Sequence, residues 1–395
     1  MPRPADRLGT LPPYLVGDIP QRKKALIAAG VDVIDLGAGD ADLPPPPGVV
    51  ESLERAARIP AMNRYGFALG HVPFREAASR FMHERFGLAF DPMTEVVPLL
   101  GSKEGLSHLA LAYVNPGDAV IVPDPGYPAY AGGTALASGE IVRYALRPRT
   151  DFLLELDEIP AETLRRARMV YLNYPNNPTA AIAPREYLER MVARCRELDL
   201  LLVYDNAYSE FGFDGYVPPS IFEIPGARDV AIEFHSLSKS YNLTGWRCGW
   251  AVGRPELVAP LQKVKTFVDT GPFMAIQAAG VTAIEQWRTF IPQNIATFRE
   301  RRDAAVAAFR AAGFVVEAPK ATMYCWIALP EGLPSAQFQR KLMDDEGVVV
   351  MPGTGFGAGG EGFFRVSFIV PPARLAEAAE RAGRVLASFA TGAAR

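Results

Sequence analysis

Short apolar segments that alternate with helical patterns constrain the fold of this 395-residue chain more than any other feature. Three such segments cover residues 119–122, 169–172 and 200–203, and each is bounded by turn-forming residues. Helical patterns at 104–113 and 185–197 precede two of them. Continuous apolar runs of this length, separated by helices, are typical of buried strands in a parallel sheet. The middle of the chain therefore predicts an α/β architecture.

The pattern changes after about residue 283. A long charged helix is expected at 290–311. It is followed by a helix expected at 335–345, strands expected at 348–351 and 363–370, and a C-terminal helix. This set of elements predicts a second, smaller α+β unit, with no flexible linker before it. We therefore expect two domains, a large one over 43–282 and a small one formed by 1–42 and 283–395.

Composition and charge exclude several classes of protein. The formal net charge is −3 with 22% charged residues, and no basic block is long enough to suggest a nucleic-acid partner. No apolar run approaches the roughly 18 residues of a membrane span, and no signal peptide is evident, so a cytoplasmic protein is expected. Cys195, Cys248 and Cys325 lie far apart, which argues against a disulfide framework and against a metal site.

The segment His235–Arg247 is the most informative stretch for chemistry. Lys239 follows an apolar strand and is flanked by Ser236, Ser238 and Ser240. A lysine amine can form a Schiff base with a carbonyl cofactor, and hydroxyls with Arg247 nearby are the groups that bind a phosphate. A surface lysine in a serine-rich turn explains this segment, taken alone, equally well.

The same segment fits S-x-x-K, the motif that makes a serine the nucleophile of β-lactamases and penicillin-binding proteins. Ser236 would then be acylated. Those enzymes also carry S-D-N and K-T-G motifs downstream, and neither is present in this chain. We therefore reject this interpretation.

Two glycine-rich segments invite a phosphate-binding interpretation. Gly101–Gly105 joins a strand to a helix, where free backbone N–H groups bind phosphate well, although an ordinary turn fits the segment as well or better. It is not a Walker loop. Gly355–Gly360 fits G-x-G-x-x-G, but a strand-like pattern follows it where a dinucleotide site requires a helix. We expect a loop there.

Acidic and amide side chains follow two of the predicted strands. Asp205 and Tyr208 come directly after the strand at 200–203, and Asn177 follows the strand at 169–172. The carboxyl ends of parallel strands border the ligand crevice of such sheets. An aspartate there can keep a ring nitrogen protonated and a tyrosine can bond a phenolic oxygen, although an N-cap and a proline-rich turn are the structural alternatives. Together with Lys239 and the phosphate groups, these residues predict a site for pyridoxal phosphate.

These residues and motifs resemble those of the fold-type I pyridoxal-phosphate enzymes of the class I/II aminotransferases. The motifs 101–105, 123–128, 173–179, 205–209, 234–239 and 352–357 look most like the LL-diaminopimelate aminotransferase group. The resemblance implies a three-layer α/β/α large domain of the aspartate aminotransferase type, with a mostly parallel sheet, and a smaller α+β domain from both chain ends. The large domain would bind the cofactor.

The resemblance also implies a role for each site residue. Lys239 would hold the cofactor and then act as the general base, while Asp205 would pair with its ring nitrogen. Tyr208 and Asn177 would bond its phenolic oxygen, and Tyr127 would stack on its ring. The phosphate would be bound by Ser102, Lys103, Ser236, Ser238, Arg247 and, from a neighbouring subunit, Tyr65.

Arg365 would bind the substrate α-carboxylate with the backbone of Gly39, with Asn177 beside it, and Tyr14 would line the substrate pocket. The implied reaction is a ping-pong transamination between an amino acid and a 2-oxo acid such as 2-oxoglutarate. The implied assembly is a homodimer with shared active sites, and the implied pathway is lysine biosynthesis.

Three positions depart from the family pattern. Ala180 stands where glycine is usual, so the turn after Asn177 is expected to differ because alanine disfavours positive φ. Phe267 stands where relatives tend to carry asparagine, and Met323 where an aromatic residue is usual. The donor thus stays open among LL-diaminopimelate, alanine and aspartate. A β-lyase, a decarboxylase and a cofactor-binding regulator are the other functions considered.

Overall fold

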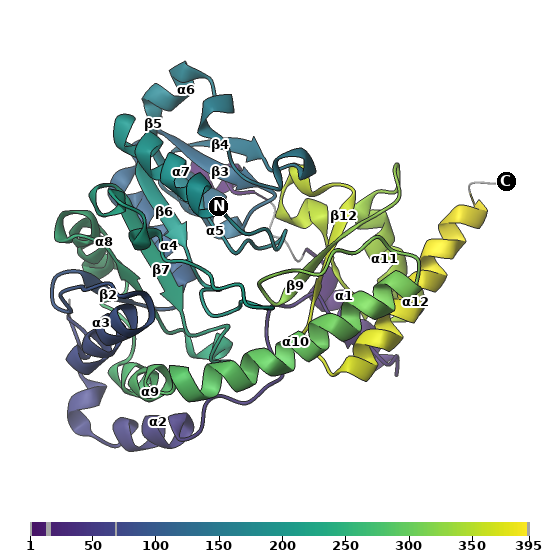
Figure 1. Cartoon of the computed structure of the whole chain (residues 1–395), viewed down its shortest axis with the longest axis horizontal. Helices are drawn as coiled ribbons and strands as arrows, with labels where there is room; N and C mark the ends of the chain where they lie inside the picture. Colours follow the sequence, from purple (N-terminus) through teal and green to yellow (C-terminus); the bar gives the residue numbers. More distant parts are fainter. Residues whose placement is uncertain (1, 13–16, 68, 393–395) are drawn as a thin grey trace.

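A seven-stranded sheet forms the centre of the larger part of the molecule (Figure 1). The computed structural model describes residues 2–12, 17–67 and 69–392. Neighbouring strands in the sheet run in the order β2 (Val96–Leu99), β8 (Gly249–Val252), β7 (Ala231–Ser236), β6 (Leu201–Asp205), β5 (Ala167–Leu172), β3 (Ala119–Asp124) and β4 (Glu140–Ala145). Only β8 pairs in antiparallel fashion with both its neighbours, so the sheet is mostly parallel, as predicted.

Alternate residues of each central strand face opposite layers of helices. Val120, Met169 and Val203 pack into one apolar cluster, whereas Ile121 and Val170 pack into another. The first face is covered by α4 (Ser102–Tyr113), α5 (Pro128–Leu136) and α8 (Pro255–Val268). The second is covered by α3 (Val72–Phe86), α7 (Arg185–Glu197) and α9 (Met274–Ile284). Burial on both faces explains why these strands are continuous apolar runs.

The smaller part of the molecule contains two short sheets and their helices. One sheet has the antiparallel order β11 (Met351–Pro352), β12 (Phe363–Ser367) and β9 (Tyr324–Ala328), and the other pairs β1 (Ile34–Asp35) in parallel with β10 (Val348–Val349). The strand expected at 348–351 is thus two strands in two sheets. Around them lie α1 (Ile19–Ala28), α11 (Ser335–Glu346) and α12 (Pro372–Gly392).

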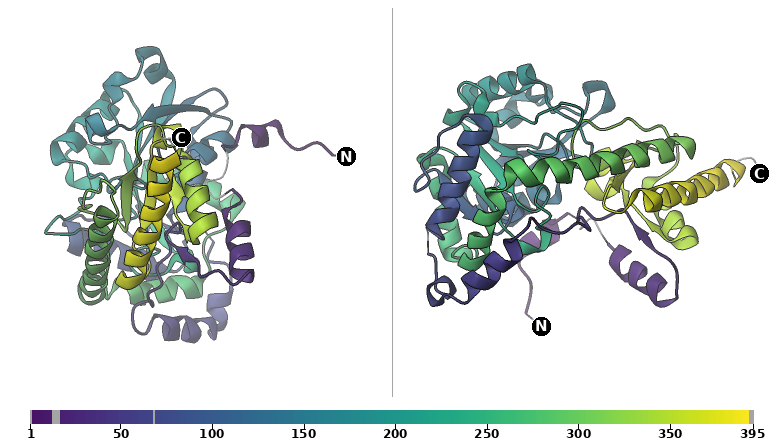
Figure 2. Two further views of the ribbon diagram at one scale, coloured as in Figure 1. Left: turned by 90° about the vertical axis from the view of Figure 1, so that its right-hand side faces the viewer. Right: turned by 60° about the horizontal axis from the view of Figure 1, so that its bottom comes forward.

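The long helix α10 (Trp287–Ala311) runs from the larger part to the smaller one, where α12 lies alongside it (Figures 1 and 2). The smaller part has its own apolar core, which includes Ile34 and Leu36 from the N-terminal side and Phe364 from the C-terminal side. The domain boundaries expected above stay a prediction.

The remaining helices are short. Two α-helices are α2 (Val49–Ala57) and α6 (Ala161–Arg166). The 3₁₀ helices are η1 (Asp6–Thr10), η2 (Pro60–Asn63), η3 (Pro148–Thr150), η4 (Leu156–Glu158), η5 (Ile221–Glu223), η6 (Ala227–Asp229), η7 (Thr244–Trp246), η8 (Gly353–Phe356) and η9 (Ala358–Gly360). Within the described ranges, none of the helices combines the length and the apolar character needed to cross a membrane.

Candidate active site

A cavity of about 420 Å³ lies where the carboxyl ends of the central strands meet the smaller part of the molecule. Asp205 ends β6, Ser236 ends β7, and Asn173 and Asn177 follow β5. The residues that line the cavity are Gly37, Gly39, Ser102, Lys103, Tyr127, Asn173, Asn177, Asp205, Ala207, Tyr208, Ser236, Ser238, Lys239, Thr244, Arg247, Tyr324, Met351, Phe356 and Arg365. The structure therefore brings together every predicted site residue except Tyr14 and Tyr65.

Asp205 is a buried carboxylate among the residues that line the cavity. The hydroxyl of Tyr130 donates to Oδ2 at 2.7 Å, whereas Oδ1 has no hydrogen-bond partner among the described residues. Burial raises the pKa of Asp205 to about 6, and the hydrogen bond from Tyr130 opposes this rise. A cationic N–H group would satisfy Oδ1 and stabilise the charged carboxylate.

Lys239 reaches across the cavity to the N-terminal part of the chain. Its Nζ donates to the carbonyl oxygen of Gly39 at 2.5 Å. A Cβ atom on residue 39 would lie 2.3 Å from the hydroxyl oxygen of Tyr324 and 3.2 Å from Nζ of Lys239. Only glycine leaves room for these two side chains. Position 39 therefore requires glycine for steric reasons, and not only because the chain turns there.

One end of the cavity is built for an anion. Helix α4 begins at Ser102, so its first backbone N–H groups have no partner within the helix. Arg247 lies beside this helix start, and its Nη1 donates to the carbonyl of Thr244 at 2.8 Å. A Cβ on Gly101, whose φ is +74°, would lie 2.5 Å from Nη2 of Arg247. A helix N-terminus, an arginine and several hydroxyls are groups that can bind a phosphate.

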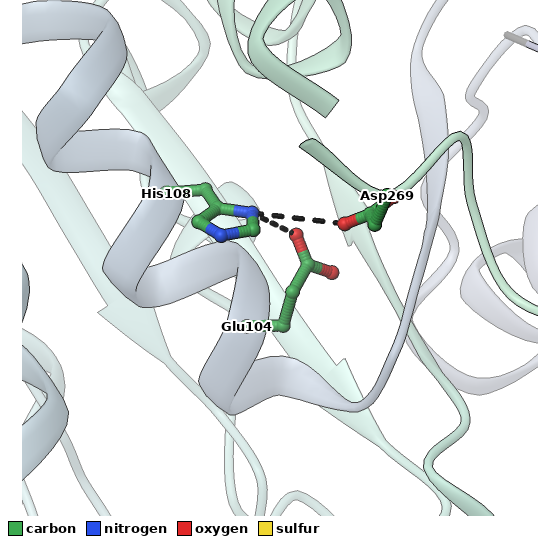
Figure 3. A group of neighbouring side chains, drawn as sticks. All are labelled: Glu104, His108 and Asp269. Atoms are coloured by element: carbon green, nitrogen blue, oxygen red, sulfur yellow. Dashed lines mark hydrogen bonds and ion pairs between the residues drawn. The ribbon is translucent and has the colours of Figure 1, made fainter. Parts of the chain in front are cut away.

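A half-buried ionic cluster lies at the first turns of α4, and Figure 3 shows three of its members, Glu104, His108 and Asp269. Glu104 accepts from the backbone N–H of Leu100 at 3.1 Å and lies 2.7 Å from Nδ1 of His108. Nζ of Lys265 donates to Glu104 at 2.8 Å and to both oxygens of Asp269 at 3.0 and 3.1 Å. Glu104, His108 and Asp269 have the spacing of metal ligands, but the ammonium of Lys265 already occupies the position of a cation between the two carboxylates.

Arg365 projects from β12 as a nearly buried guanidinium. Its Nη1 donates to Oδ1 of Asn177 at 2.7 Å and its Nη2 to the carbonyl of Gly37 at 2.6 Å, whereas Nε has no hydrogen-bond partner in the described part of the chain. The rings of Tyr324 and Phe356 lie against it, with centroids 4.1 and 4.7 Å from Cζ. A guanidinium that is fixed in this way and lines the cavity is suited to bind a carboxylate.

The segment Gly355–Gly360 lies across the short 3₁₀ helices η8 and η9 and leads into the strand β12, without the α-helix that a dinucleotide site requires. This segment packs against the end of β3, where the N–H of Gly359 donates to Asp124 at 2.9 Å. A Cβ on residue 357 or 359 would lie only 2.0 or 2.4 Å from atoms of Asp124. The glycines therefore allow a close contact between the two parts of the molecule, and this contact holds Phe356 at the cavity.

The cavity lining does not include two of the predicted site residues. Tyr65 is 74% exposed, contacts the ring of Phe67 and does not line the cavity of its own chain. Tyr14 lies outside the described residues. The turn after Asn177 also differs from expectation, because Ala180 adopts φ +60° and keeps the left-handed conformation that glycine would take.

Tyr130, Tyr324 and Phe356 were missed by the sequence analysis, although each contacts a predicted site residue. Tyr130 lies at core spacing in α5, two residues after a proline, and nothing in that spacing distinguishes it from a packing residue. Tyr324 belongs to an apolar strand pattern. The sequence signal for Phe356 was its place within the glycine-rich motif.

Comparison with known proteins gives one consistent result. Residues 31–381 match the family described as aminotransferase class I and II. LL-diaminopimelate aminotransferase from Nitratidesulfovibrio vulgaris (strain DP4) is 46% identical over 382 residues, which cover 96% of this chain and 98% of that protein. LL-diaminopimelate aminotransferase from Aquifex aeolicus is 46% identical over 95% of this chain and 97% of its own length.

Solved structures agree with this match. Substrate-bound BacF from Bacillus subtilis superposes with a TM-score of 0.93 and 32% identity, over 97% of this chain and 98% of that one. A probable N-succinyldiaminopimelate aminotransferase from Thermus thermophilus gives a TM-score of 0.88 at 36% identity, over 93% of this chain and 98% of that one.

Proposed function

Because the chain belongs to the class I and II aminotransferases, which use pyridoxal 5′-phosphate, we propose that it moves an amino group from LL-diaminopimelate or a closely related amino acid to a 2-oxo acid such as 2-oxoglutarate. The observation that carries the proposal is the convergence of Lys239, Asp205 and Arg365 on one cavity. The 46% identity to LL-diaminopimelate aminotransferases supports the choice of donor. The enzyme would act in the cytoplasm, in lysine biosynthesis.

The cavity fits the cofactor in charge and in hydrogen bonding. Oδ1 of Asp205, which has no partner among the described residues, would receive the N–H of the cofactor ring. Tyr127 would lie against the ring, and Tyr208 and Asn177 would bond its phenolic oxygen. The phosphate would be bound at the start of α4 by Ser102, Lys103, Ser236, Ser238 and Arg247. When bound, pyridoxal phosphate supplies a carbonyl carbon that takes up the amino group and a ring that accepts the electrons left by the departing α-proton.

The chain's own residues would orient the substrate and move its proton. Arg365, already held by Asn177 and Gly37, would bind the α-carboxylate with its guanidinium and leave the α-carbon facing Lys239. Nζ of Lys239 would take the α-proton and return it at the neighbouring position, as a general base and then a general acid. The same groups would serve the second half-reaction, because a 2-oxo acid carries the same α-carboxylate.

We further propose a homodimer, formed through an aromatic surface patch. The exposed residues are Tyr65, Phe67, Phe267, Val268 and Phe273, and Phe267 is 86% exposed. Tyr65, Phe67 and Phe273 line one surface depression. Phe267 and Val268 directly precede Asp269, which lines the same depression as the other three. Exposed aromatic side chains gathered in this way mark a protein–protein contact. A second copy of this chain would cover them, and Tyr65 would then reach the phosphate site of its neighbour.

The dimer is tested by molar mass in solution. Light scattering after size-exclusion chromatography should give twice the chain mass for the wild type, and Phe267→Asp should shift the protein toward the monomer. Val315→Asp is the matched control, because Val315 is 78% exposed but lies outside the patch. A wild-type protein that elutes as a monomer at micromolar concentration would contradict the proposal.

The reaction is tested by a panel of amino donors with 2-oxoglutarate, measured as kcat/KM. LL-diaminopimelate should give the highest value, followed by alanine and aspartate. Lys239→Ala should abolish turnover, whereas Lys263→Ala, an exposed lysine of α8, should not change it. A Lys239→Ala variant with the wild-type rate would exclude the assignment, and consumption of the donor without amination of 2-oxoglutarate would point to lyase or decarboxylase chemistry.

A further inference from the structure

We propose that Tyr324 is a positioning residue that couples the two halves of the site, because its hydroxyl bonds Tyr208 on the cofactor side and its ring lies against Arg365 on the carboxylate side. This inference rests on the proposed cofactor site. Tyr324 is the first residue of β9, is 1% exposed and lines the cavity. It would orient both neighbours without contacting the transferred group.

The hydroxyl of Tyr324 has a defined partner. It lies 2.9 Å from the hydroxyl of Tyr208, which is also buried. Without a ligand, either hydroxyl can be the donor. Burial alone would raise the pKa of Tyr324, but the nearby cations Lys239 and Arg365 and the bond with Tyr208 together lower it. Burial raises the pKa of Tyr208, and its contact with Tyr324 raises it further.

Tyr208 has a single hydroxyl hydrogen, so when that hydrogen is directed to the phenolic oxygen of a bound cofactor, the bond between the two phenols is made by donation from Tyr324 to Tyr208. Hydrogen bonds arranged in series polarise one another, so the donation from Tyr324 strengthens the donation from Tyr208. Tyr324 thereby helps to keep that phenolic oxygen ionised.

The ring of Tyr324 contacts a second residue of the site, Arg365. Its centroid lies 4.1 Å from Cζ of Arg365, within the range of a cation–π contact. This contact and the two hydrogen bonds of Arg365 fix the plane of the guanidinium. The hydroxyl and the ring of Tyr324 therefore act on different partners, and substitution can separate their effects.

Tyr324→Phe removes the hydroxyl and keeps the ring. In the loaded enzyme, the pH at the midpoint of the visible absorbance change should rise by about 0.5, because a neutral hydrogen bond of ordinary strength is worth that much of a pKa. The KM for the amino donor should stay within about twofold of the wild-type value. An unchanged midpoint would overturn the role of the hydroxyl.

A double-mutant cycle shows whether Tyr324 acts through Tyr208. If it does, Tyr208→Phe and Tyr208→Phe/Tyr324→Phe should have the same midpoint. Additive shifts would overturn the proposed path. A wild-type protein that shows no visible absorbance with pyridoxal phosphate would instead refute the proposed function, so the two failures are distinguishable.

Tyr324→Leu removes the ring as well. It should bind glutarate, a dicarboxylate that cannot be aminated, about fivefold more weakly than Tyr324→Phe does, a loss in the range of one cation–π contact. Phe356→Leu is the matched control, since it removes the other ring against Arg365 and should weaken glutarate binding without moving the absorbance midpoint. Tyr324→Met replaces the leucine variant if that variant does not fold. Equal glutarate affinity in the leucine (or methionine) and phenylalanine variants would overturn the role of the ring.

Discussion

The hydroxyl of Tyr130 donates to one oxygen of Asp205 at 2.7 Å, and the other oxygen has no hydrogen-bond partner among the described residues. Tyr130 is 1% exposed, and its ring stacks on Tyr171 with centroids 4.6 Å apart. Asp205 is thus turned by a side chain that lies behind the site. The orientation of the carboxylate precedes any ligand.

Tyr130→Phe should weaken cofactor binding about tenfold. The anion of Asp205 loses a donor, and a hydrogen bond to a charged group contributes roughly 1.5 kcal/mol or more. The measurement is the Kd of the apoprotein for pyridoxal phosphate. Tyr113→Phe is the control, because its hydroxyl bonds the distant carbonyl of Leu257. Equal affinities of the two variants would show that the contact with Asp205 does not affect the cofactor.

Asp205 should make the apoprotein less stable as pH rises from about 4 to about 7. Its pKa in the folded chain is about 6, above the ordinary value of 3.8, so the unfolded chain releases the proton first. The free energy of unfolding of the wild type, relative to Asp205→Asn, should fall by on the order of 3 kcal/mol over this range. The loaded enzyme should show a smaller fall, since a protonated ring nitrogen would pair with Oδ1. A relative stability that rises with pH would contradict the burial of an uncompensated carboxylate.

Lys265→Met should destabilise the protein by about 3 kcal/mol and lower its affinity for pyridoxal phosphate. The substitution leaves the carboxylates of Glu104 and Asp269 facing each other without the ammonium that bonds both. Denaturant unfolding and cofactor titration measure the two effects. Lys263→Met, on the exposed side of the same helix, should behave as the wild type.

Gly359→Ala should be destabilising by about 1 to 3 kcal/mol, because its Cβ would lie 2.4 Å from the carbonyl oxygen of Asp124. The displaced segment should also raise the KM for the amino donor through Phe356. Gly132→Ala in α5 is the opposite case, because its Cβ meets nothing within 4 Å and alanine favours a helix. Thermal melting of both variants should show shifts of opposite sign.

Ala180→Gly should stabilise the protein by about 0.5 to 1 kcal/mol. Ala180 has φ +60°, and the left-handed conformation costs an L-residue more than the entropy that glycine loses on folding. Ala183→Gly, at a nearby position with negative φ, should instead lower the free energy of unfolding. A loss of stability in both variants would show that the turn at 180 is not strained.

The sequence predicted the sheet, and most of the residues that line the cavity, for one physical reason. The strands are buried on both faces and are followed by polar residues. Each strand and the polar residue after it, such as Asp205, Asn177 or Lys239, can therefore be recognised from a short stretch of sequence. The long helix was also predictable from its pattern. Short elements were not, since the segment 348–351 contributes to two sheets through long-range pairing.

The residues that the sequence did not reveal act across long separations. Tyr130 meets Asp205 75 positions away, and Tyr208 meets Tyr324 116 positions away. From their spacing alone, Tyr130 and Tyr324 look like core aromatic residues, because the partner of each hydroxyl belongs to another element. Lys265 is a similar case, since its bond with Glu104 joins α8 to α4.

The ammonium of Lys265 is a counter-ion that the chain carries with it. A dissolved cation between Glu104 and Asp269 would exchange with the solvent, and its occupancy would follow the ionic strength and the presence of chelators. A covalently attached ammonium has a fixed stoichiometry and returns to the same carboxylates after every local opening. The turn at the start of α4, from Gly101 to Glu104, is therefore ordered before an anion binds. Anion binding does not have to supply the free energy of ordering this turn.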